Sequence, residues 1–328
     1  MKGILIENGE DGYHARVADI DEAQMPAGDV VVNIAHSSLN YKDALAITGK
    51  APVVRTFPMI PGIDFAGVIE SSESETFAVG DSVLLNGWGL GETRWGGLAA
   101  KARVKAEWLV RLPDAFDSRD AMAIGTAGYT AMLCVTALAE GDVRPGDGEV
   151  IVSGASGGVG SIAILLLARR GYRVVALTGR SEQTEYLRSL GAAEVLDSGA
   201  FSAKGKPLAR ERWAGAVDTT GGMILANICA SIRYGGTVAA CGLALSMDFP
   251  TTVAPFILRG ITLVGIDSVY ASIERRRTAW TTLASELDPT SLRQVTKQVA
   301  LTEAVEGATQ LLERKIHGRI VVDVEASK

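Results

Sequence analysis

The most informative segment of the chain is Val150-Ile151-Val152-Ser153-Gly154-Ala155-Ser156-Gly157-Gly158-Val159-Gly160. The apolar residues predict a buried strand, the glycines predict a tight turn, and the apolar run that follows predicts a helix. Glycine lets the backbone of such a turn approach a ligand closely, and the free N–H groups at the start of the helix attract a pyrophosphate. A glycine-rich turn that binds nothing is the alternative.

Strands and helices alternate regularly from about Glu149 onward. Strands are expected over residues 149–153, 173–178, 194–196, 216–218, 237–241 and 261–265, with helices over 159–170 and 182–190. Six strands of this kind fit a doubly wound parallel sheet. Continuous apolar runs such as residues 174–177 suit strands that are covered on both faces. The predicted fold class of this part is therefore α/β.

The first third of the chain has a different rhythm. Short strands are expected over residues 29–35, 64–71 and 81–85, separated by turn residues, which predicts a compact β-rich domain. After Asp267 come a charged helix around residues 274–277, another helix ending near Lys315 and a last strand over 319–324. We infer a discontinuous first domain of residues 1–122 and 268–328, interrupted by a nucleotide-binding domain of residues 123–267.

The composition narrows the class of protein. The chain has 328 residues, 47% hydrophobic and 21% charged, which suits a folded protein of two domains. A formal charge of −6 argues against nucleic acid as a partner. The apolar run 162–168 is too short to span a membrane, and residues 1–7 lack the plan of a signal peptide, so we expect a cytoplasmic protein. The widely spaced Cys134, Cys229 and Cys241 indicate buried free thiols.

The end of the second strand of the α/β part discriminates between two coenzymes. Enzymes that bind NAD usually have an Asp or Glu there, which holds the ribose hydroxyls. This chain has Thr178-Gly179-Arg180-Ser181 instead. Arginine can pair with a 2′-phosphate, and the two hydroxyl side chains can donate to it, so the residues favour NADPH over NADH. An exposed, solubilising Arg180 is the alternative.

The sequence lacks the set of residues that would bind a catalytic metal ion. A zinc site of the dehydrogenase type needs Cys, His and an acidic residue, but the segment 61–67 has Ile63 where a histidine ligand is expected. His14, His36 and His317 lie far apart, and we find no nucleophile elbow of a serine hydrolase. Hydride transfer without a metal suits a C=C bond that a carbonyl already activates, because hydrogen-bond donors suffice to stabilise the enolate.

Several motifs together resemble a known family. Residues 37–43, 61–67, 125–131 and the glycine loop resemble the quinone oxidoreductase branch of the medium-chain dehydrogenase/reductase superfamily. More narrowly, the chain resembles the bacterial NADPH-dependent acryloyl-CoA reductases. The resemblance lies in residues 40–50, 57–67, Trp88-Gly89, Trp95-Gly96-Gly97, 250–253 and 255–259. The resemblance implies a GroES-like β-rich catalytic domain joined to a Rossmann domain.

The resemblance also implies an activity and a set of site residues. It implies that a homo-oligomer, a dimer, uses NADPH to reduce acryloyl-CoA to propionyl-CoA. Tyr41 is then expected beside the nicotinamide, residues 156–159 on the pyrophosphate and residues 178–180 on the adenosine phosphate. The full set expected around the coenzyme is Tyr41, Ser156, Gly157, Gly158, Val159, Thr178, Gly179, Arg180, Asp218, Leu263 and Arg276.

Asn40 and Tyr41 are the candidate catalytic residues. A donor at either position could orient the nicotinamide ring or stabilise the enolate; alternatively the pair only positions the coenzyme, and solvent supplies the proton. Arg55 and residues 275–277 are candidates for CoA phosphates, although three arginines at the start of a helix more often form a solvated face, so no CoA contact is assigned. Two other functions stay open on this scaffold: an NADPH-dependent quinone or enone reductase, and a non-enzymatic NADPH-binding protein.

Overall fold

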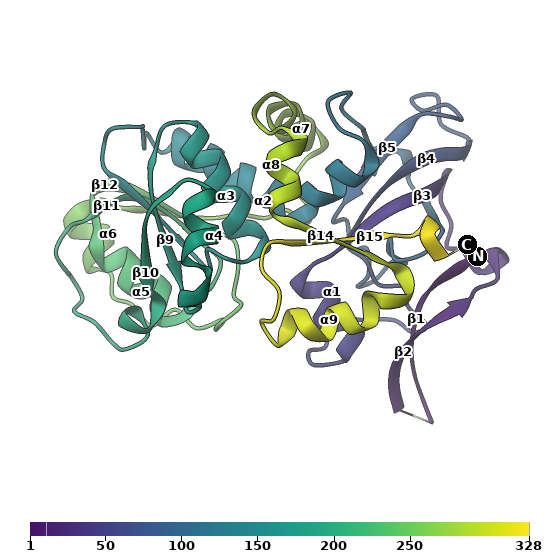
Figure 1. Ribbon diagram of the computed structural model, residues 1–328, viewed down its shortest axis with the longest axis horizontal. Coiled ribbons are helices and arrows are strands. Elements are labelled where there is room, and N and C mark those ends of the chain that lie inside the picture. Colours follow the sequence, from purple (N-terminus) through teal and green to yellow (C-terminus); the bar gives the residue numbers. More distant parts are fainter. Residues whose placement is uncertain (11, 328) are drawn as a thin grey trace. The chain divides into compact units, whose positions relative to one another are not determined.

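The computed structural model describes residues 1–10 and 12–327, shown in Figure 1. The chain divides into two compact units: Met1–Tyr129 with Ser268–Lys328, and Thr130–Asp267. The first unit is therefore built from two separate stretches of chain, between which the second is inserted. The expected boundary between residues 122 and 123 lies in the same helix as the change of unit at Tyr129.

A six-stranded parallel sheet forms the centre of the unit Thr130–Asp267 (Figure 1). Its strands are β8 (Glu149–Ser153), β9 (Arg173–Thr178), β10 (Ala192–Asp197), β11 (Trp213–Asp218), β12 (Ile232–Ala240) and β13 (Thr262–Gly265). Their order in the sheet is β10-β9-β8-β11-β12-β13, so successive strands are added on one side of β8 as far as β10 and on the other side from β11 onward. This is the doubly wound Rossmann order. The predicted α/β fold class is confirmed.

Apolar residues explain why these strands lie in the middle of the unit. Val150, Ile151 and Val152 are completely buried, as expected for a strand covered on both faces. The helices that follow the strands are α3 (Gly158–Arg169), α4 (Thr184–Ser189), α5 (Gly222–Ser231) and α6 (Ala254–Arg259). The three cysteines are free; Cys134 and Cys229 are buried, whereas Cys241 is only half-buried, which corrects the expectation for that residue.

The long helix α2 (Ser118–Glu140) has no counterpart in the sequence-based expectations. Its backbone is kinked at Gly125, where φ is 51°. The helix is long and apolar enough to cross a membrane, but 94% of its most apolar window is buried inside the protein. The helix is apolar around most of its circumference because it lies in the core, so it lacks the one-sided pattern that marks a surface helix.

Antiparallel pairing dominates the other unit. β1 (Lys2–Gly9) and β2 (Gly12–Asp19) form a two-stranded sheet. A seven-stranded sheet has the order β14 (Thr296–Ala300), β15 (Arg319–Asp323), β3 (Val30–Leu39), β4 (Asp64–Ser72), β5 (Ser82–Asn86) and β7 (Val110–Arg111), and β6 (Lys101–Val104) also pairs with β3. Because β15 pairs with β3, the last strand of the chain joins the sheet built by its first third.

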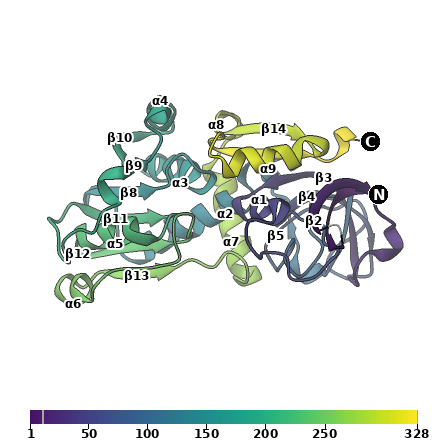
Figure 2. The ribbon, with the colours of Figure 1, turned by 90° about the horizontal axis from the view of Figure 1, so that it is seen from below.

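Four α-helices accompany this sheet: α1 (Tyr41–Thr48), α7 (Ile273–Glu286), α8 (Pro289–Gln294) and α9 (Ala304–Leu312). α1 and α9 pack side by side, as Figures 1 and 2 both show. Short 3-10 turns are η1 (Glu22–Gln24), η2 (Ala106–Trp108), η3 (Ser181–Gln183), η4 (Ser198–Phe201), η5 (Leu301–Glu303) and η6 (Glu325–Ser327). The helix expected around residues 274–277 is α7, and the one expected to end near Lys315 is α9.

Candidate functional site

The glycine loop joins β8 to α3. Glycine occupies the positions at which the loop packs most closely against other residues. Gly154 has a φ of 57°, and a Cβ atom there would lie 2.1 Å from Oγ1 of Thr219. A Cβ at Gly160 would lie 2.5 Å from the carbonyl oxygen of Gly154. Any side chain at either position would force the loop apart. The loop therefore has the form of a cradle that presents main-chain N–H groups at the start of a 12-residue helix.

Ser156, Thr178 and Arg180 come together beside this loop. The Arg180 guanidinium donates from Nη2 to Oγ of Ser156 over 2.7 Å and from Nε over 3.1 Å. Oγ of Ser156 lies 3.1 Å from Oγ1 of Thr178. Both hydroxyl residues are buried. A cation and two hydroxyls at the carboxyl ends of adjacent parallel strands are the chemistry that a phosphate group requires.

Asp218 ends β11 and braces the point where the strand order reverses. This completely buried carboxylate accepts hydrogen bonds from Oγ of Ser153 over 2.5 Å, from Oγ1 of Thr220 over 2.9 Å and from the N–H of Gly221 over 2.8 Å. It thereby ties the carboxyl ends of β8 and β11 together. Leu263, in the edge strand β13, packs against the apolar core of the unit.

A buried polar network surrounds the start of α1 in the other unit. Asn40 is the N-cap residue of this helix. Its Nδ2 donates to the carboxylates of Asp43 over 3.1 Å and Asp64 over 3.0 Å, and its Oδ1 accepts from Nη1 of Arg319 over 3.1 Å. The amide is thus engaged on both sides within the protein. This geometry makes Asn40 a bridge between two carboxylates and a guanidinium.

Arg319 completes the network from the last strand. It is 2% exposed, and its Nη2 donates to Oγ of Ser38 over 2.7 Å, which in turn donates to Asp64 over 2.6 Å. Gly125 makes room for this guanidinium, because a Cβ there would lie 2.4 Å from Nη2. Sequence reasoning missed the role of Arg319. The available signal was a single cation at the start of the apolar strand 319–324, where a long charged side chain is rarely buried without a partner.

Asp43 is held by main-chain donors as well as by Asn40. Its Oδ1 accepts from the N–H groups of Gly62 over 3.1 Å and Ile63 over 2.9 Å, and its Oδ2 accepts from the N–H of Asn40 over 2.9 Å. Burial and the neighbouring Asp64 carboxylate nevertheless raise the pKa of Asp43 to about 7. Burial lowers the pKa of Arg319. Over residues 1–10 and 12–327, no three His, Cys, Asp or Glu side chains are grouped to hold a metal ion.

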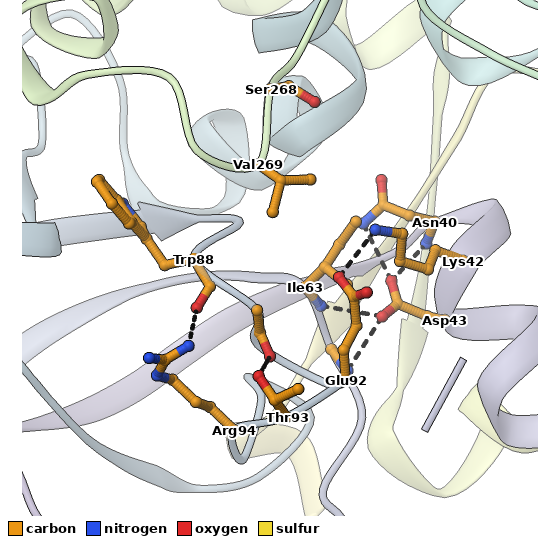
Figure 3. Close-up of polar contacts among 12 residues, drawn as sticks. Asn40, Lys42, Asp43, Ile63, Trp88, Glu92, Thr93, Arg94, Ser268 and Val269 are labelled. Carbon is orange, nitrogen blue, oxygen red and sulfur yellow. Dashed lines mark hydrogen bonds and ion pairs between the residues drawn. The ribbon is translucent and has the colours of Figure 1, made fainter. Parts of the chain in front are cut away.

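Tyr41 is the first residue of α1 and differs from its neighbour in accessibility. Its side chain is 46% exposed, whereas Asn40 is 8% exposed. Of the two candidate catalytic residues, Tyr41 therefore offers an accessible donor, and Asn40 holds the helix that carries it. Lys42 follows and forms an ion pair with Glu92 at 2.8 Å, drawn in Figure 3. This pair links α1 to the glycine-rich loop of residues 87–97.

Arg276, an expected neighbour of the coenzyme, is bound to its own unit. Its side chain is 1% exposed and donates to the carbonyl oxygens of Asn86 over 2.6 Å, Ser268 over 3.1 Å and Val269 over 2.6 Å. Its guanidinium also lies 4.8 Å from the ring centroid of Trp88. The N–H of Trp88 donates to the carbonyl oxygen of Val269 over 3.0 Å, and both residues are labelled in Figure 3. Arg276 thus fastens the start of the returning chain to the end of β5.

The raised pKa of Asp43 predicts a pH dependence of stability. The ordinary pKa of an Asp is 3.8, so between about pH 4 and pH 7 the folded state binds more protons at Asp43 than the unfolded state does. The contribution of Asp43 to the free energy of unfolding therefore falls as the pH rises through this window. We expect the urea midpoint of Asp43→Asn to fall less between pH 5 and pH 8 than that of the native chain, although its stability is lower throughout because acceptors are lost.

Asp81→Asn is the control, because hydrogen bonds from Ala78 and Arg111 lower the pKa of this half-buried carboxyl. Its titration lies below the measured window, so its slope should match that of the native chain. Equal slopes for Asp43→Asn and the native chain would contradict the assignment.

Two family models match the chain, one for each kind of domain. The model described as alcohol dehydrogenase GroES-like domain matches residues 26–114, and the model described as zinc-binding dehydrogenase matches residues 158–285. The first match falls on the β-rich unit and the second begins at the first residue of α3.

Several known proteins are similar over nearly their whole length. The probable acrylyl-CoA reductase AcuI of Escherichia coli is 52% identical, with 99% of this chain and 100% of the relative covered. The acrylyl-CoA reductase AcuI of Ruegeria pomeroyi is 45% identical over the same shares. The putative quinone oxidoreductase YhfP of Bacillus subtilis is 42% identical, with 98% of both chains covered.

Solved structures agree with these relatives. The yhdH oxidoreductase of Salmonella enterica, crystallised with NADP, has a TM-score of 0.97 and 50% identity, covering 99% of this chain and 100% of its own. The yhfP protein of Bacillus subtilis, crystallised with NAD, has a TM-score of 0.94 and 41% identity, covering 98% and 99%. The resemblance seen in the sequence is confirmed: this chain belongs to the acrylyl-CoA reductase AcuI family, in the zinc-free quinone oxidoreductase branch of the medium-chain dehydrogenase/reductases.

Proposed function

We propose that this chain is an NADPH-dependent enzyme that reduces the C=C bond of acryloyl-CoA to give propionyl-CoA. The observation that carries the proposal is the identity of 52% and 45% to two acrylyl-CoA reductases along the full length of both. The matched region extends over both units, so it covers the segments that contain the candidate catalytic residues and the glycine loop. The bound coenzyme supplies the hydride that adds to the β-carbon of the enoyl thioester.

The residues beside the glycine loop fit the phosphorylated coenzyme. Residues 178–181 offer a guanidinium and hydroxyls and no carboxylate that would repel a 2′-phosphate. We place the pyrophosphate on the loop residues Ser156, Gly157, Gly158 and Val159, where side chains are small and the helix begins. Thr178, Gly179 and Arg180 then hold the adenosine phosphate. Asp218 and Leu263 contribute by shaping the sheet beneath.

The other unit supplies the candidate donor. We propose that the Tyr41 hydroxyl donates a hydrogen bond to the thioester oxygen, where negative charge develops as the β-carbon is reduced. Asn40 positions Tyr41 by capping α1 and bridging the buried carboxylates. Arg276 acts in the same way, by fixing the main chain around Val269. The functional domains are proposed to be residues 1–122 with 268–328, and residues 123–267.

A quinone or enone reductase is the second candidate, since the relative from Bacillus subtilis bears that name. Parallel assays of NADPH oxidation at 340 nm with acryloyl-CoA, crotonyl-CoA and a small quinone separate the two. Faster turnover of the quinone would overturn the proposed substrate while leaving the coenzyme argument intact.

A dimer is the proposed assembly in solution. Strand β13 has no neighbour on its outer side within the described sheet, and the segment that leads to it exposes large apolar side chains. Those more than half exposed are Leu243, Met247, Val253, Ile257 and Leu258. Pairing of two copies along β13 would cover this surface.

The expected mass in solution is twice the 34.4 kDa of the chain, and Ile257→Lys should shift it to the monomer. A monomeric native chain would exclude the dimer.

The proposed location is the cytoplasm. The three cysteines are all free, which is typical of proteins kept in a reducing compartment.

Arg180→Ala should weaken NADPH binding by roughly 10- to 100-fold, because one charge-assisted contact to the 2′-phosphate is lost. The affinity for NADH, which lacks that phosphate, should change by no more than about twofold. Fluorescence titration of both coenzymes measures the effect. Arg188→Ala removes an exposed arginine from α4 of the same unit and is the control. Equal losses for the two coenzymes would show that Arg180 serves only the fold of the loop.

Tyr41→Phe should lower kcat by roughly 10²-fold, the usual effect of removing one donor to an oxyanion, and leave the dissociation constant of NADPH unchanged. Steady-state kinetics and coenzyme titration give the two quantities separately. Tyr234→Phe is the control, since Tyr234 is 78% exposed in the other unit. Full turnover of Tyr41→Phe would refute a catalytic hydroxyl at this position.

A further inference from the structure

A cavity lies at the amino ends of the strands of the parallel sheet, whereas the glycine loop lies at their carboxyl ends. The cavity has a volume of about 990 Å³, and its lining belongs entirely to the unit Thr130–Asp267. Glu149, Arg173, Trp213 and Arg233 in its wall stand at or next to the first residues of β8, β9, β11 and β12. The glycine loop follows the last residue of β8. Since all strands of this sheet are parallel, the cavity is distinct from the proposed coenzyme site.

Positive charge dominates this cavity. Four arginines line it, namely Arg173, Arg210, Arg212 and Arg233, together with two glutamates, Glu149 and Glu211. The chain as a whole carries a formal charge of −6, so this cluster of guanidinium groups has the opposite sign to the overall charge. A local positive field on an acidic protein attracts a small anion without attracting a polyanion such as nucleic acid.

Both glutamates are already neutralised by other groups. Glu149 accepts from Nε of Arg173 over 3.1 Å and from Nε of Arg212 over 2.9 Å, and these arginines lower its pKa. Glu211 lies 3.3 Å from Nε of Arg259, which is outside the cavity lining, and it accepts from the N–H of Tyr234 over 3.1 Å. The carboxylates therefore do not cancel the remaining arginines.

Arg210 and Arg233 provide the excess charge. Both side chains are exposed. Neither forms an ion pair with a carboxylate of the described residues, unlike Arg173, Arg212 and Arg259. Nη1 of Arg233 donates to the carbonyl oxygen of Asp147. Gly148 allows this placement, because its φ is 144° and a Cβ there would lie 2.5 Å from Nη1 of Arg233. The main chain thus holds one guanidinium at the cavity wall.

The cavity also has an aromatic wall. Phe201 and Trp213 line it, and the Arg212 guanidinium lies 4.1 Å from the centroid of the Trp213 ring. Trp213 is 1% exposed, and its Nε1 is a buried donor for which the described residues supply no acceptor. The Trp213 ring is thus enclosed beneath the Arg212 guanidinium, and Phe201 is the aromatic side chain of this wall that a ligand can reach.

We propose that this cavity is a second ligand site, which binds a small molecule bearing phosphate groups. Guanidinium groups bind phosphate oxygens in pairs, and Arg210 and Arg233 are the two that remain available for it. The volume exceeds that of a single phosphate, so the ligand carries more than one anionic group or an organic part that packs against Phe201. Binding in this cavity does not depend on which substrate the enzyme reduces.

Inorganic pyrophosphate is the probe, titrated calorimetrically into the full chain at fixed ionic strength. Saturation with NADP⁺ beforehand blocks the glycine loop, so that heat reports only a second site. Trp213 is the one tryptophan of the unit Thr130–Asp267, and its fluorescence gives an independent signal that Trp213→Phe abolishes. We expect saturable binding, and a change in fluorescence at the same concentrations.

The variant Arg210→Ala/Arg233→Ala should weaken this binding by roughly tenfold or more and leave the affinity for NADPH unchanged. The matched control Arg188→Ala/Lys204→Ala removes two exposed charges from the same unit outside the cavity lining, and it should bind pyrophosphate as the native chain does. Equal weakening in both double variants would show a diffuse effect of net charge. That result, the absence of binding, or binding of citrate without binding of pyrophosphate would overturn the proposal.

Discussion

The buried bridge from Asn40 to two carboxylates and Arg319 is the constraint on which the β-rich unit depends. It joins the start of α1, the strand β4 through Asp64, and the last strand of the chain. A buried charge is tolerated only when its hydrogen bonds are satisfied, and loss of one partner from such a group typically costs about 3–5 kcal/mol. The network thereby fixes where α1 begins, and so where Tyr41 is presented.

Local pattern was enough to predict the parallel sheet. The strands of residues 149–153 and 173–178 were expected at the bounds that the structure has, because apolar runs of that length have no other stable place than a covered sheet. The helix α2 could not be predicted in the same way. Its residues are buried on most sides, and Gly125 and Gly128 interrupt its apolar run, so neither periodicity nor capping marks it.

In the candidate site, too, contacts set by local pattern could be predicted, whereas contacts set by tertiary packing could not. The cluster of Ser156, Thr178 and Arg180 was predictable, because the fold itself places the ends of adjacent strands side by side. The role of Arg276 was not, since its acceptors are main-chain carbonyl oxygens brought close by tertiary packing. Arg319 was hidden for a similar reason: its partners lie in segments far away in sequence, from Ser38 to Ala123.

The return of the chain to its first unit bears on the order in which the protein matures during translation. Thr130–Asp267 is complete as soon as it leaves the ribosome, and domains generally fold as units during synthesis. The β-rich unit must wait for its last strand, since β3 has an open edge until β15 is made. Until then Asp43 and Asp64 also lack the cation that accompanies them in the finished protein. The nascent chain therefore carries a folded Rossmann domain attached to a β-rich unit whose main sheet is still unfinished.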